Sequence, residues 1–428
     1  MTPTLSQPAA VAQPSDVPTQ PGAKARRISR IEALTVVLGA ALAVAVGVDG
    51  PAPWPAVRAL VILGLTAATL WARRRLGTRG GGTVLLAFGL VGIIAGLGIG
   101  VPYAIAVGTS AVTVAGLAAL VTGVALVGIA ATTLVRQARS WRKLLALPIG
   151  LGIALLVVAP ISMAVFVTNV PPEELGSGTP TDGGMAYEDV SLRTDDGVRL
   201  TGWYVPSRNG AAIVLLGGMG TRADEIDHAA VLARHGYGVL LLDVRGHGGS
   251  DGDAMLWGWN GDVDVRAAVD YLDARPDVDD TGIGALGMSV GGEQVIGAAG
   301  ADDRIRAVVA EGASARGARD EGDPARGVGG WIMRYVDWTT KHAADLMTSA
   351  EPPTKLRDAI VAAAPRPVMV IAAGTQPQEI DAAHVFQSAA PGSVELWIAP
   401  DAGHTEAYDM YPAEWEQRVI DFLDRALD

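Results

Sequence analysis

The sequence contains no cysteine among its 428 residues. This absence excludes disulfide bonds, thiolate catalysis and zinc sites built on cysteine, although it does not fix the compartment. The motifs His-Glu-x-x-His and Gly-x-x-x-x-Gly-Lys-Ser/Thr are also absent, so neither a zincin nor a P-loop is indicated. We therefore predict an activity that uses no metal and no cofactor.

Acidic residues are scarce in the first part of the chain, and they outnumber basic residues in the second. Residues 1–170 carry 13 Lys/Arg and 3 Asp/Glu, whereas the remainder carries 20 and 42. This split predicts two parts that lie in different solvents. The acidic part lacks the basic footprint that nucleic acids require, so we predict no nucleic-acid partner. Its excess of acid favours solubility.

The first part has few charges of either sign, and none from Thr83 to Val135. Residues 1–30 are predicted to be a disordered cytoplasmic N-terminus, because residues 1–23 are rich in Pro, Ser, Thr and Gln. The segment 31–170 is predicted to be a transmembrane domain of about five helices. Its apolar spans lie at 33–48, 56–72, 83–101, 111–135 and 144–168. A spanning helix needs about 20 apolar residues, so the first two spans are marginal, and the first also fits a cleaved signal peptide.

Basic clusters alternate with loops that lack Lys and Arg. The clusters lie at 24–30, 73–79 and 136–143, and the loops without them at 49–55 and 101–110. The positive-inside rule then predicts a multi-pass protein of the cell membrane with an extracytoplasmic C-terminal domain. Arg58 falls near the outer end of the second span, where its long side chain can reach the interface.

A linker at 171–186 precedes a region in which strand and helix patterns alternate. The predicted strands are 189–192, 198–205, 211–216, 239–243, 282–286, 307–310, 367–372 and 394–398. The predicted helices between the later strands and at the end are 225–235, 262–275, 290–299 and 414–426. This alternation predicts an α/β domain with a doubly wound, mostly parallel sheet. The first strands have no helices between them, so we expect them to pair antiparallel at one edge.

Ser289 lies in Gly287-Met288-Ser289-Val290-Gly291, between a predicted strand and a predicted helix. A serine on such a sharp turn projects its hydroxyl above the sheet, and the flanking glycines permit the turn. A second match around Ser250 is followed by Asp-Gly and no helix, so we interpret Ser250 as loop structure. The glycine pattern at 282–287 lies inside the strand, which argues against a dinucleotide site.

The order of elements, the Ser289 turn and the segment Asp243-Val244-Arg245-Gly246-His247-Gly248-Gly249-Ser250 resemble the α/β-hydrolase family over residues 187–428. The loop after the third strand reads Gly217-Gly218-Met219-Gly220, where the family often has His-Gly. The resemblance implies a serine hydrolase in which Ser289 is the nucleophile and His404, in the loop after the last strand, is the base.

The resemblance also implies a carboxylate behind His404 and an oxyanion hole. Glu379 is the first candidate for the acid, with Asp381 and Glu311 as alternatives. The oxyanion donors are expected to be the backbone N–H groups of Met219 and Val290.

Residues 315–364 form a possible cap insertion with Trp331, Tyr335 and Trp338 at helical spacing. They fit either a cap over the site or a stripe that packs against the domain. The predicted function is a membrane-anchored serine hydrolase that cleaves carboxylic esters of a small-molecule or acyl substrate. The alternatives are an amide or thioester hydrolase, as in a peptidase, and a non-catalytic binding or sensing module.

Overall fold

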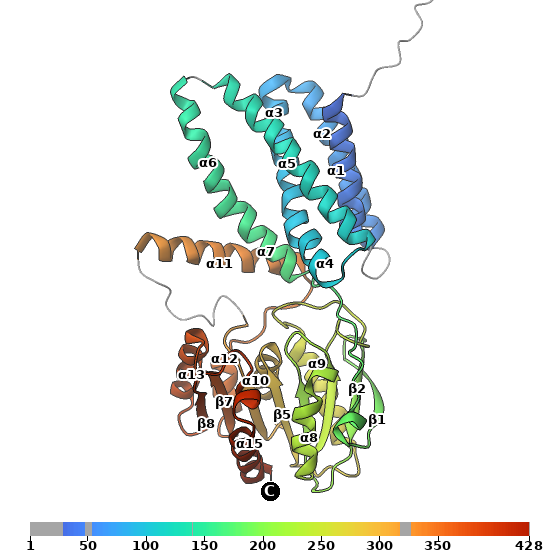
Figure 1. The fold of residues 1–428 in the computed structure, drawn as a ribbon, viewed down its shortest axis with the longest axis vertical. Coiled ribbons are helices and arrows are strands. Elements are labelled where there is room, and N and C mark those ends of the chain that lie inside the picture. The colour runs from blue at the N-terminus through green and yellow to red at the C-terminus, as the bar shows by residue number, and fades with distance from the viewer. Residues whose placement is uncertain (1–28, 48–53, 139, 317–326, 428) are drawn as a thin grey trace, which may run out of the picture.

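The computed structural model describes residues 29–47, 54–138, 140–316 and 327–427. These residues form a bundle of helices followed by an α/β domain (Figure 1). The disordered N-terminus predicted for residues 1–30 lies outside the described residues, except for its last two, and Arg30 already begins the first helix.

The bundle consists of long helices, some of which continue through short π-helical or 3₁₀ segments. They are α1 (Arg30–Gly47), α2 (Trp54–Arg75), α3 (Gly77–Ala95), η1 (Gly96–Gly100), α4 (Val101–Ala106), α5 (Ala111–Gln137), η2 (Ser140–Leu145), α6 (Ala146–Ile153), η3 (Ala154–Val158) and α7 (Ala159–Val167). Within the described residues, four stretches are long and apolar enough to cross a membrane: Pro55–Arg75, Gly77–Ala106, Ala111–Gln137 and Ser140–Val167.

The first predicted span is the one that is not among these four. It forms α1, which has 18 residues and carries Arg30 and Glu32 in its first turn. Among the described residues, four helices are thus long and apolar enough to cross a membrane, where the sequence predicted about five.

Glycines allow the bundle helices to approach closely. A Cβ atom added to Gly116 of α5 would lie 2.4 Å from the Cα of Gly100 in η1, and one added to Gly123 would lie 2.7 Å from the carbonyl oxygen of Gly89 in α3. Contacts of backbone against backbone are typical of membrane helices, which pack through small residues.

The C-terminal domain contains a sheet of eight strands in the order β1-β2-β4-β3-β5-β6-β7-β8. The strands are β1 (Glu188–Arg193), β2 (Arg199–Val205), β3 (Ala212–Leu216), β4 (Gly238–Asp243), β5 (Ile283–Met288), β6 (Ala307–Glu311), β7 (Val368–Ala373) and β8 (Val394–Ala399). Strands β1, β2 and β4 pair antiparallel, and all other pairs are parallel. The predicted mostly parallel sheet with an antiparallel edge is confirmed.

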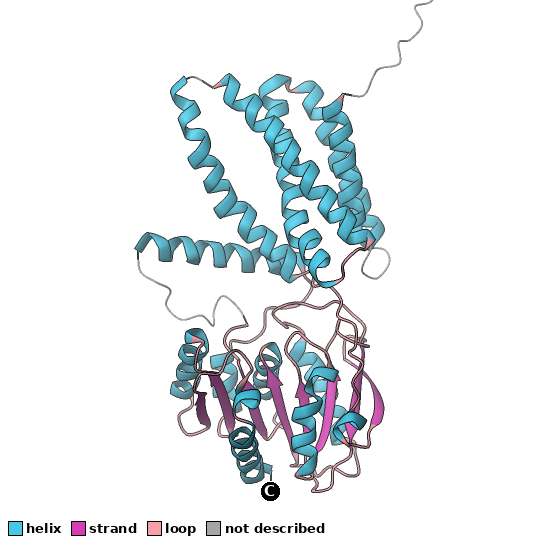
Figure 2. Ribbon diagram, viewed as in Figure 1, coloured by secondary structure: helices cyan, strands magenta, loops and turns pink. Residues whose placement is uncertain are grey.

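Helices cover both faces of this sheet, as Figure 2 shows. One apolar core lies under α9, α10, α12 and α13, and a second lies under α8 and α15. The bounds are η4 (Pro180–Gly183), η5 (Arg222–Glu225), α8 (Ile226–Arg234), α9 (Gly261–Asp273), α10 (Val290–Ala301), α12 (Leu356–Ala363), α13 (Pro377–Ala389), α14 (Ala407–Met410) and α15 (Pro412–Leu427). The domain is therefore doubly wound, as predicted.

The two parts of the chain are joined by backbone hydrogen bonds as well as by the linker. Leu256 N–H donates to the carbonyl of Val167 at the end of α7 (3.0 Å), and Gly248 N–H donates to the carbonyl of Glu173 in the linker (3.0 Å). The loop after β4 is thus tied to the last bundle helix and to the chain that follows it.

Helix α11 (Gly327–Met347) is the main described element of the predicted insertion. It packs against α7 and η3 of the bundle and runs across the end of the bundle, between the bundle and the sheet (Figure 1). Trp331 and Trp338 remain 55% and 54% exposed. The aromatic stripe therefore does not close a packing surface against the α/β domain.

Candidate active site

Ser289 lies on the turn between β5 and α10. Its backbone has φ 52° and ψ −120°, a left-handed conformation that costs a residue with a side chain about 1–3 kcal/mol. The conformation is held because Ser289 N–H donates to the carbonyl of Glu311 in β6 at 2.7 Å. The strained turn lifts the hydroxyl off the end of the sheet.

The glycines on either side of Ser289 are required by close backbone contacts. A Cβ atom on Gly287 would lie 2.3 Å from the carbonyl carbon of Gly291, and one on Gly291 would lie 2.3 Å from the carbonyl oxygen of Gly217. Such separations are shorter than any real carbon contact, so only glycine fits at both positions. The motif seen in the sequence is therefore a packing requirement of this turn.

His404 stands between Ser289 and Glu379. Its Nε2 lies 2.8 Å from Ser289 Oγ, and its Nδ1 lies 2.7 Å from Glu379 Oε1. Because a carboxylate can only accept, Nδ1 carries the proton and Nε2 is left to accept the serine proton. The side chain of His404 is 48% exposed, so a substrate can reach it.

Glu379 is buried, with 2% of its surface exposed. Its Oε2 accepts a hydrogen bond from the N–H of Ala373 at the end of β7 (2.9 Å), which leaves Oε1 to face the imidazole. The hydrogen bond to Glu379 raises the pKa of His404 above its usual 6.5, because the negative carboxylate stabilises the imidazolium. This arrangement is that of a base oriented by an acid.

The other two carboxylates considered for the acid have different surroundings. Glu311 is buried, and it accepts hydrogen bonds from the N–H of Ala407 (3.0 Å) and from Trp415 Nε1 (2.9 Å). Burial raises the pKa of Glu311, and its contacts hold the C-terminal helices in place. Asp381 lies on the exposed side of α13. Of the three candidates, only Glu379 is within hydrogen-bond distance of His404.

Met219 and Val290, the predicted oxyanion donors, line one small cavity of about 20 Å³ beside the serine. The loop that carries Met219 passes close to the nucleophile, since a Cβ atom on Gly218 would lie 3.0 Å from Ser289 Cβ. Val290 is the first residue of α10, so the positive end of the helix dipole also faces this region. Trp259, from the loop after β4, lines the same cavity.

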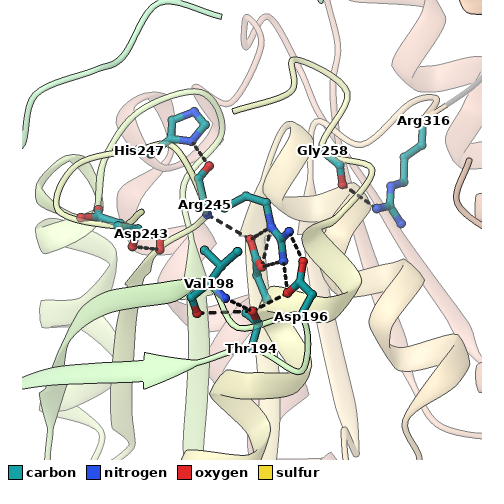
Figure 3. A network of polar contacts seen from close by, with 10 residues as sticks. Thr194, Asp196, Val198, Asp243, Arg245, His247, Gly258 and Arg316 are labelled. Atoms are coloured by element: carbon teal, nitrogen blue, oxygen red, sulfur yellow. Dashed lines mark hydrogen bonds and ion pairs between the residues drawn. The ribbon is translucent and has the colours of Figure 1, made fainter. Parts of the chain in front are cut away.

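An ionic network fixes the loop after β4 that forms one wall of the cavity (Figure 3). Arg245 is 8% exposed, and its guanidinium binds Asp264 (2.6 Å) and Asp196 (2.7 Å). His247 Nδ1 donates to the carbonyl of Arg245 at 3.1 Å. The sequence analysis did not identify this network, because its members lie far apart in the chain and no short motif joins them.

Ser250, the serine of the second glycine motif, lies in the same loop, and its hydroxyl is occupied by hydrogen bonds. Its hydroxyl donates to the carbonyl of Asp243 (2.6 Å) and accepts from the N–H of Thr201 (2.9 Å). These contacts agree with the interpretation of Ser250 as loop structure. No cluster of three or more His, Cys, Asp or Glu that could bind a metal occurs in the described parts of the chain.

Comparisons with known proteins agree with this geometry. Residues 225–428 match the prolyl oligopeptidase family. The match covers most of the C-terminal domain and both members of the Ser289–His404 pair.

Several curated proteins are similar to parts of this chain. An uncharacterized protein of Mycobacterium tuberculosis is 38% identical over 27% of this chain and 41% of its own length. A thiohydrolase of Aspergillus aculeatus is 33% identical over 29% of this chain and 40% of its own. The chain thus spans less than half the length of these relatives. An uncharacterized protein of Escherichia coli is 26% identical over 56% of this chain and 82% of its own.

Among solved structures, an esterase of Pyrococcus furiosus is 26% identical, with a TM-score of 0.49, over 61% of this chain and 99% of its own.

Proposed function

We propose that this protein is a membrane-anchored serine hydrolase that cleaves carboxylic esters through Ser289, His404 and Glu379. The observation that carries the proposal is the continuous relay from Ser289 Oγ to His404 Nε2 (2.8 Å) and from His404 Nδ1 to Glu379 Oε1 (2.7 Å). A serine hydroxyl is a weak nucleophile near neutral pH, and it needs such an oriented base to react.

In this mechanism Ser289 Oγ attacks the carbonyl carbon of the ester while His404 Nε2 takes the hydroxyl proton. The oxyanion that forms faces the backbone N–H groups of Met219 and Val290, and losing one such donor costs about 10²–10³ in rate. His404 then gives its proton to the leaving alcohol, and an acyl-enzyme remains on Ser289. Water deprotonated by His404 attacks this acyl group and releases the acid, which regenerates the serine.

Two other acyl substrates use the same steps. A relative is named a thiohydrolase and the matching family is named for peptidases, so thioesters and amides are the second candidates. A non-catalytic binding or sensing role needs no such relay. Comparing matched ester, thioester and anilide substrates at one acyl chain length ranks the three chemistries by kcat/KM.

A fluorophosphonate probe tests the nucleophile, because it labels only an activated serine. We expect wild type to be labelled and to hydrolyse p-nitrophenyl butyrate, and Ser289→Ala to lose both. Ser250→Ala is the matched control, since Ser250 lies in the competing glycine motif and is occupied by backbone contacts. Equal labelling of wild type and Ser289→Ala would refute the mechanism.

We also infer that the bundle spans a cell membrane with the hydrolase domain outside the cytoplasm. The ends that carry basic clusters meet at one end of the bundle: Arg74 of α2 pairs with Glu32 of α1 (2.9 Å), and Arg79 of α3 donates to Gln137 of α5 (3.3 Å). The hydrolase domain lies at the opposite end (Figure 1). By the positive-inside rule, the basic end faces the cytoplasm.

Helix α11 supports a membrane boundary at the hydrolase end. It runs across that end of the bundle (Figure 1), and it exposes the large apolar side chains of Val328, Trp331, Met333, Trp338 and Leu346. An amphipathic helix with tryptophans on its apolar side is typical of a segment that lies in the headgroup region.

The absence of cysteine makes the orientation testable with single introduced thiols. Thr181→Cys places one in the exposed linker turn η4, and Ser140→Cys places one at the basic end before α6. In intact cells we expect a membrane-impermeant maleimide to label the Thr181→Cys protein at once and the Ser140→Cys protein only after permeabilisation. The reverse pattern would invert the orientation.

A further inference from the structure

A second, much larger cavity lies where the bundle meets the hydrolase domain. Its volume is about 920 Å³, which is within the range of about 300–1,000 Å³ that is usual for sites of small organic ligands. The first two helices of the bundle, α1 and α2, and its last helix, α7, contribute to its lining. The linker, the loop after β4 and Met347, the last residue of α11, also line it.

The walls of this cavity divide into an apolar part and a polar part. The apolar part is formed within the bundle, by side chains that include Leu42, Ile62, Ile94, Ile99, Ile161 and Val165. The polar part lies toward the hydrolase domain and comprises Arg58, Ser110, Thr168, Asn169 and Asp253. A cavity with these two ends suits an amphiphile whose hydrocarbon chain enters the bundle and whose polar group stays at the boundary.

The large cavity adjoins the small one beside Ser289. Val170 and Asp253 line both, and the small cavity also contains Met219 and Val290, the proposed oxyanion residues. The small cavity, of about 20 Å³, has room for about one water molecule. A substrate must therefore displace side chains there, and the unbranched, flexible Met219 and Met255 are suited to such movement.

We propose that the large cavity binds the acyl chain of a bilayer amphiphile and presents its ester to Ser289. The inference rests on the proposed function and adds the substrate class, a long-chain acyl ester taken from the membrane. The membrane region is then part of the binding site as well as an anchor. The motive is that the lining runs from apolar side chains in the bundle, past the polar residues, to Met219 and Val290, and Val290 directly follows the nucleophile in the chain.

The test uses the full chain in proteoliposomes with p-nitrophenyl laurate and p-nitrophenyl butyrate as probes. Burial of each additional methylene is worth about fourfold in affinity, so we expect kcat/KM for laurate to exceed that for butyrate by at least about tenfold. Ile161→Trp fills the cavity from α7 and should lower this laurate-to-butyrate ratio about tenfold. Met163→Trp is the matched control, because Met163 lies two residues away and is 42% exposed; it should leave the ratio unchanged.

Fluorophosphonate labelling of Ser289 in each variant reports whether the site is folded. A laurate-to-butyrate ratio near one in wild type, or a ratio that Ile161→Trp leaves unchanged while labelling is intact, overturns the inference. Absence of both labelling and butyrate hydrolysis in wild type refutes the proposed function instead.

A second measurement does not depend on catalysis. A palmitate that carries a diazirine in its chain is irradiated with the Ser289→Ala protein in the same liposomes, and the modified peptides are identified by mass spectrometry. We expect crosslinks in the cavity-lining parts of α3, η1 and α7, and their loss when Ile161 is replaced by tryptophan. Crosslinks that are confined to the outer surface of the bundle, and that this replacement does not change, count against the cavity and indicate ordinary contact with lipid.

Discussion

Replacement of Glu379 by glutamine is the sharpest test of the relay, because the two carboxylate oxygens have two different donors. Oε1 faces the Nδ1–H of His404 at 2.7 Å, and Oε2 faces the N–H of Ala373 at 2.9 Å. A glutamine keeps the shape of the side chain but offers one acceptor oxygen and one NH₂ group. One of the two donors must therefore face another donor.

Both orientations of the amide have a defined cost. If its NH₂ group faces His404, the imidazole proton moves to Nε2 and Ser289 loses its base, a change of tautomer that lowers kcat about 10⁴-fold in serine hydrolases. If its NH₂ group faces Ala373, a buried N–H is left without an acceptor, which costs about 1–3 kcal/mol of folding free energy. We expect kcat/KM for p-nitrophenyl butyrate to fall about 10³–10⁴-fold.

The pH profile separates this mechanism from simple damage to the fold. His404 must be neutral to act as base, so activity is lost as pH falls through the His404 pKa. The hydrogen bond to Glu379 raises that pKa above 6.5, and the rising limb of kcat/KM in wild type is therefore expected above pH 6.5. In Glu379→Gln the negative charge is gone, and the limb should move to lower pH.

Asp381→Asn is the matched control, since it removes the same charge from an exposed position on the same helix. We expect its kcat/KM to stay within about twofold of wild type, as for most surface substitutions. The assay is kcat/KM measured from about pH 5 to about pH 9, a range that brackets the usual histidine pKa. If both variants give the same profile, or if the limb of Glu379→Gln moves to higher pH, Glu379 does not orient His404.

Two further substitutions test the scaffold of the site by thermal and denaturant unfolding. Gly291→Ala should lower the free energy of unfolding by at least about 1–3 kcal/mol, because its Cβ would lie 2.3 Å from the carbonyl oxygen of Gly217. Gly392→Ala is the control, because a Cβ atom there has nothing within 4 Å. It should change the free energy of unfolding by less than about 0.5 kcal/mol. Glu311→Gln should cost about 1–3 kcal/mol, since one amide oxygen cannot serve both of its donors, Trp415 among them. A free energy of unfolding that Glu311→Gln leaves unchanged would show that these two hydrogen bonds do not stabilise the fold.

The elements formed by residues that are close together in the chain could be predicted from the sequence. The eight strands are short apolar runs with polar turns between them, and the structure has a strand at each predicted place. The turn at Ser289 could be recognised because its glycines are neighbours in the chain. The position of His404 followed from the loop after the last predicted strand.

The acid could not be settled from the sequence, because its contacts join distant residues. Glu379 lies in the first turn of α13, which begins at Pro377 and was not among the predicted helices. Proline is favoured at the first position of a helix, so Pro377 was the signal for this start. The contact of Glu311 with Trp415 spans 104 residues, and no pattern along the chain reveals it.

The short first helix shows a different limit of sequence reasoning. Span 33–48 is apolar throughout, but whether it crosses a bilayer depends on its ends. Glu32 pairs with Arg74 of α2, and this contact places the polar start of α1 beside the polar end of its neighbour. Hydropathy alone does not contain that information.

The hydrogen bond between Leu256 and the end of α7 restricts which substrates Ser289 could reach. A catalytic domain on a flexible linker samples a large volume and can encounter any ester within it. Here the loop beside the nucleophile is fastened to the helix itself, and Gly248 is fastened to the chain that follows it. With the bundle in a bilayer, Ser289 would be held at a constant distance from the membrane surface. Substrates would then be selected by the depth at which their scissile bond lies, as well as by the chemistry of that bond.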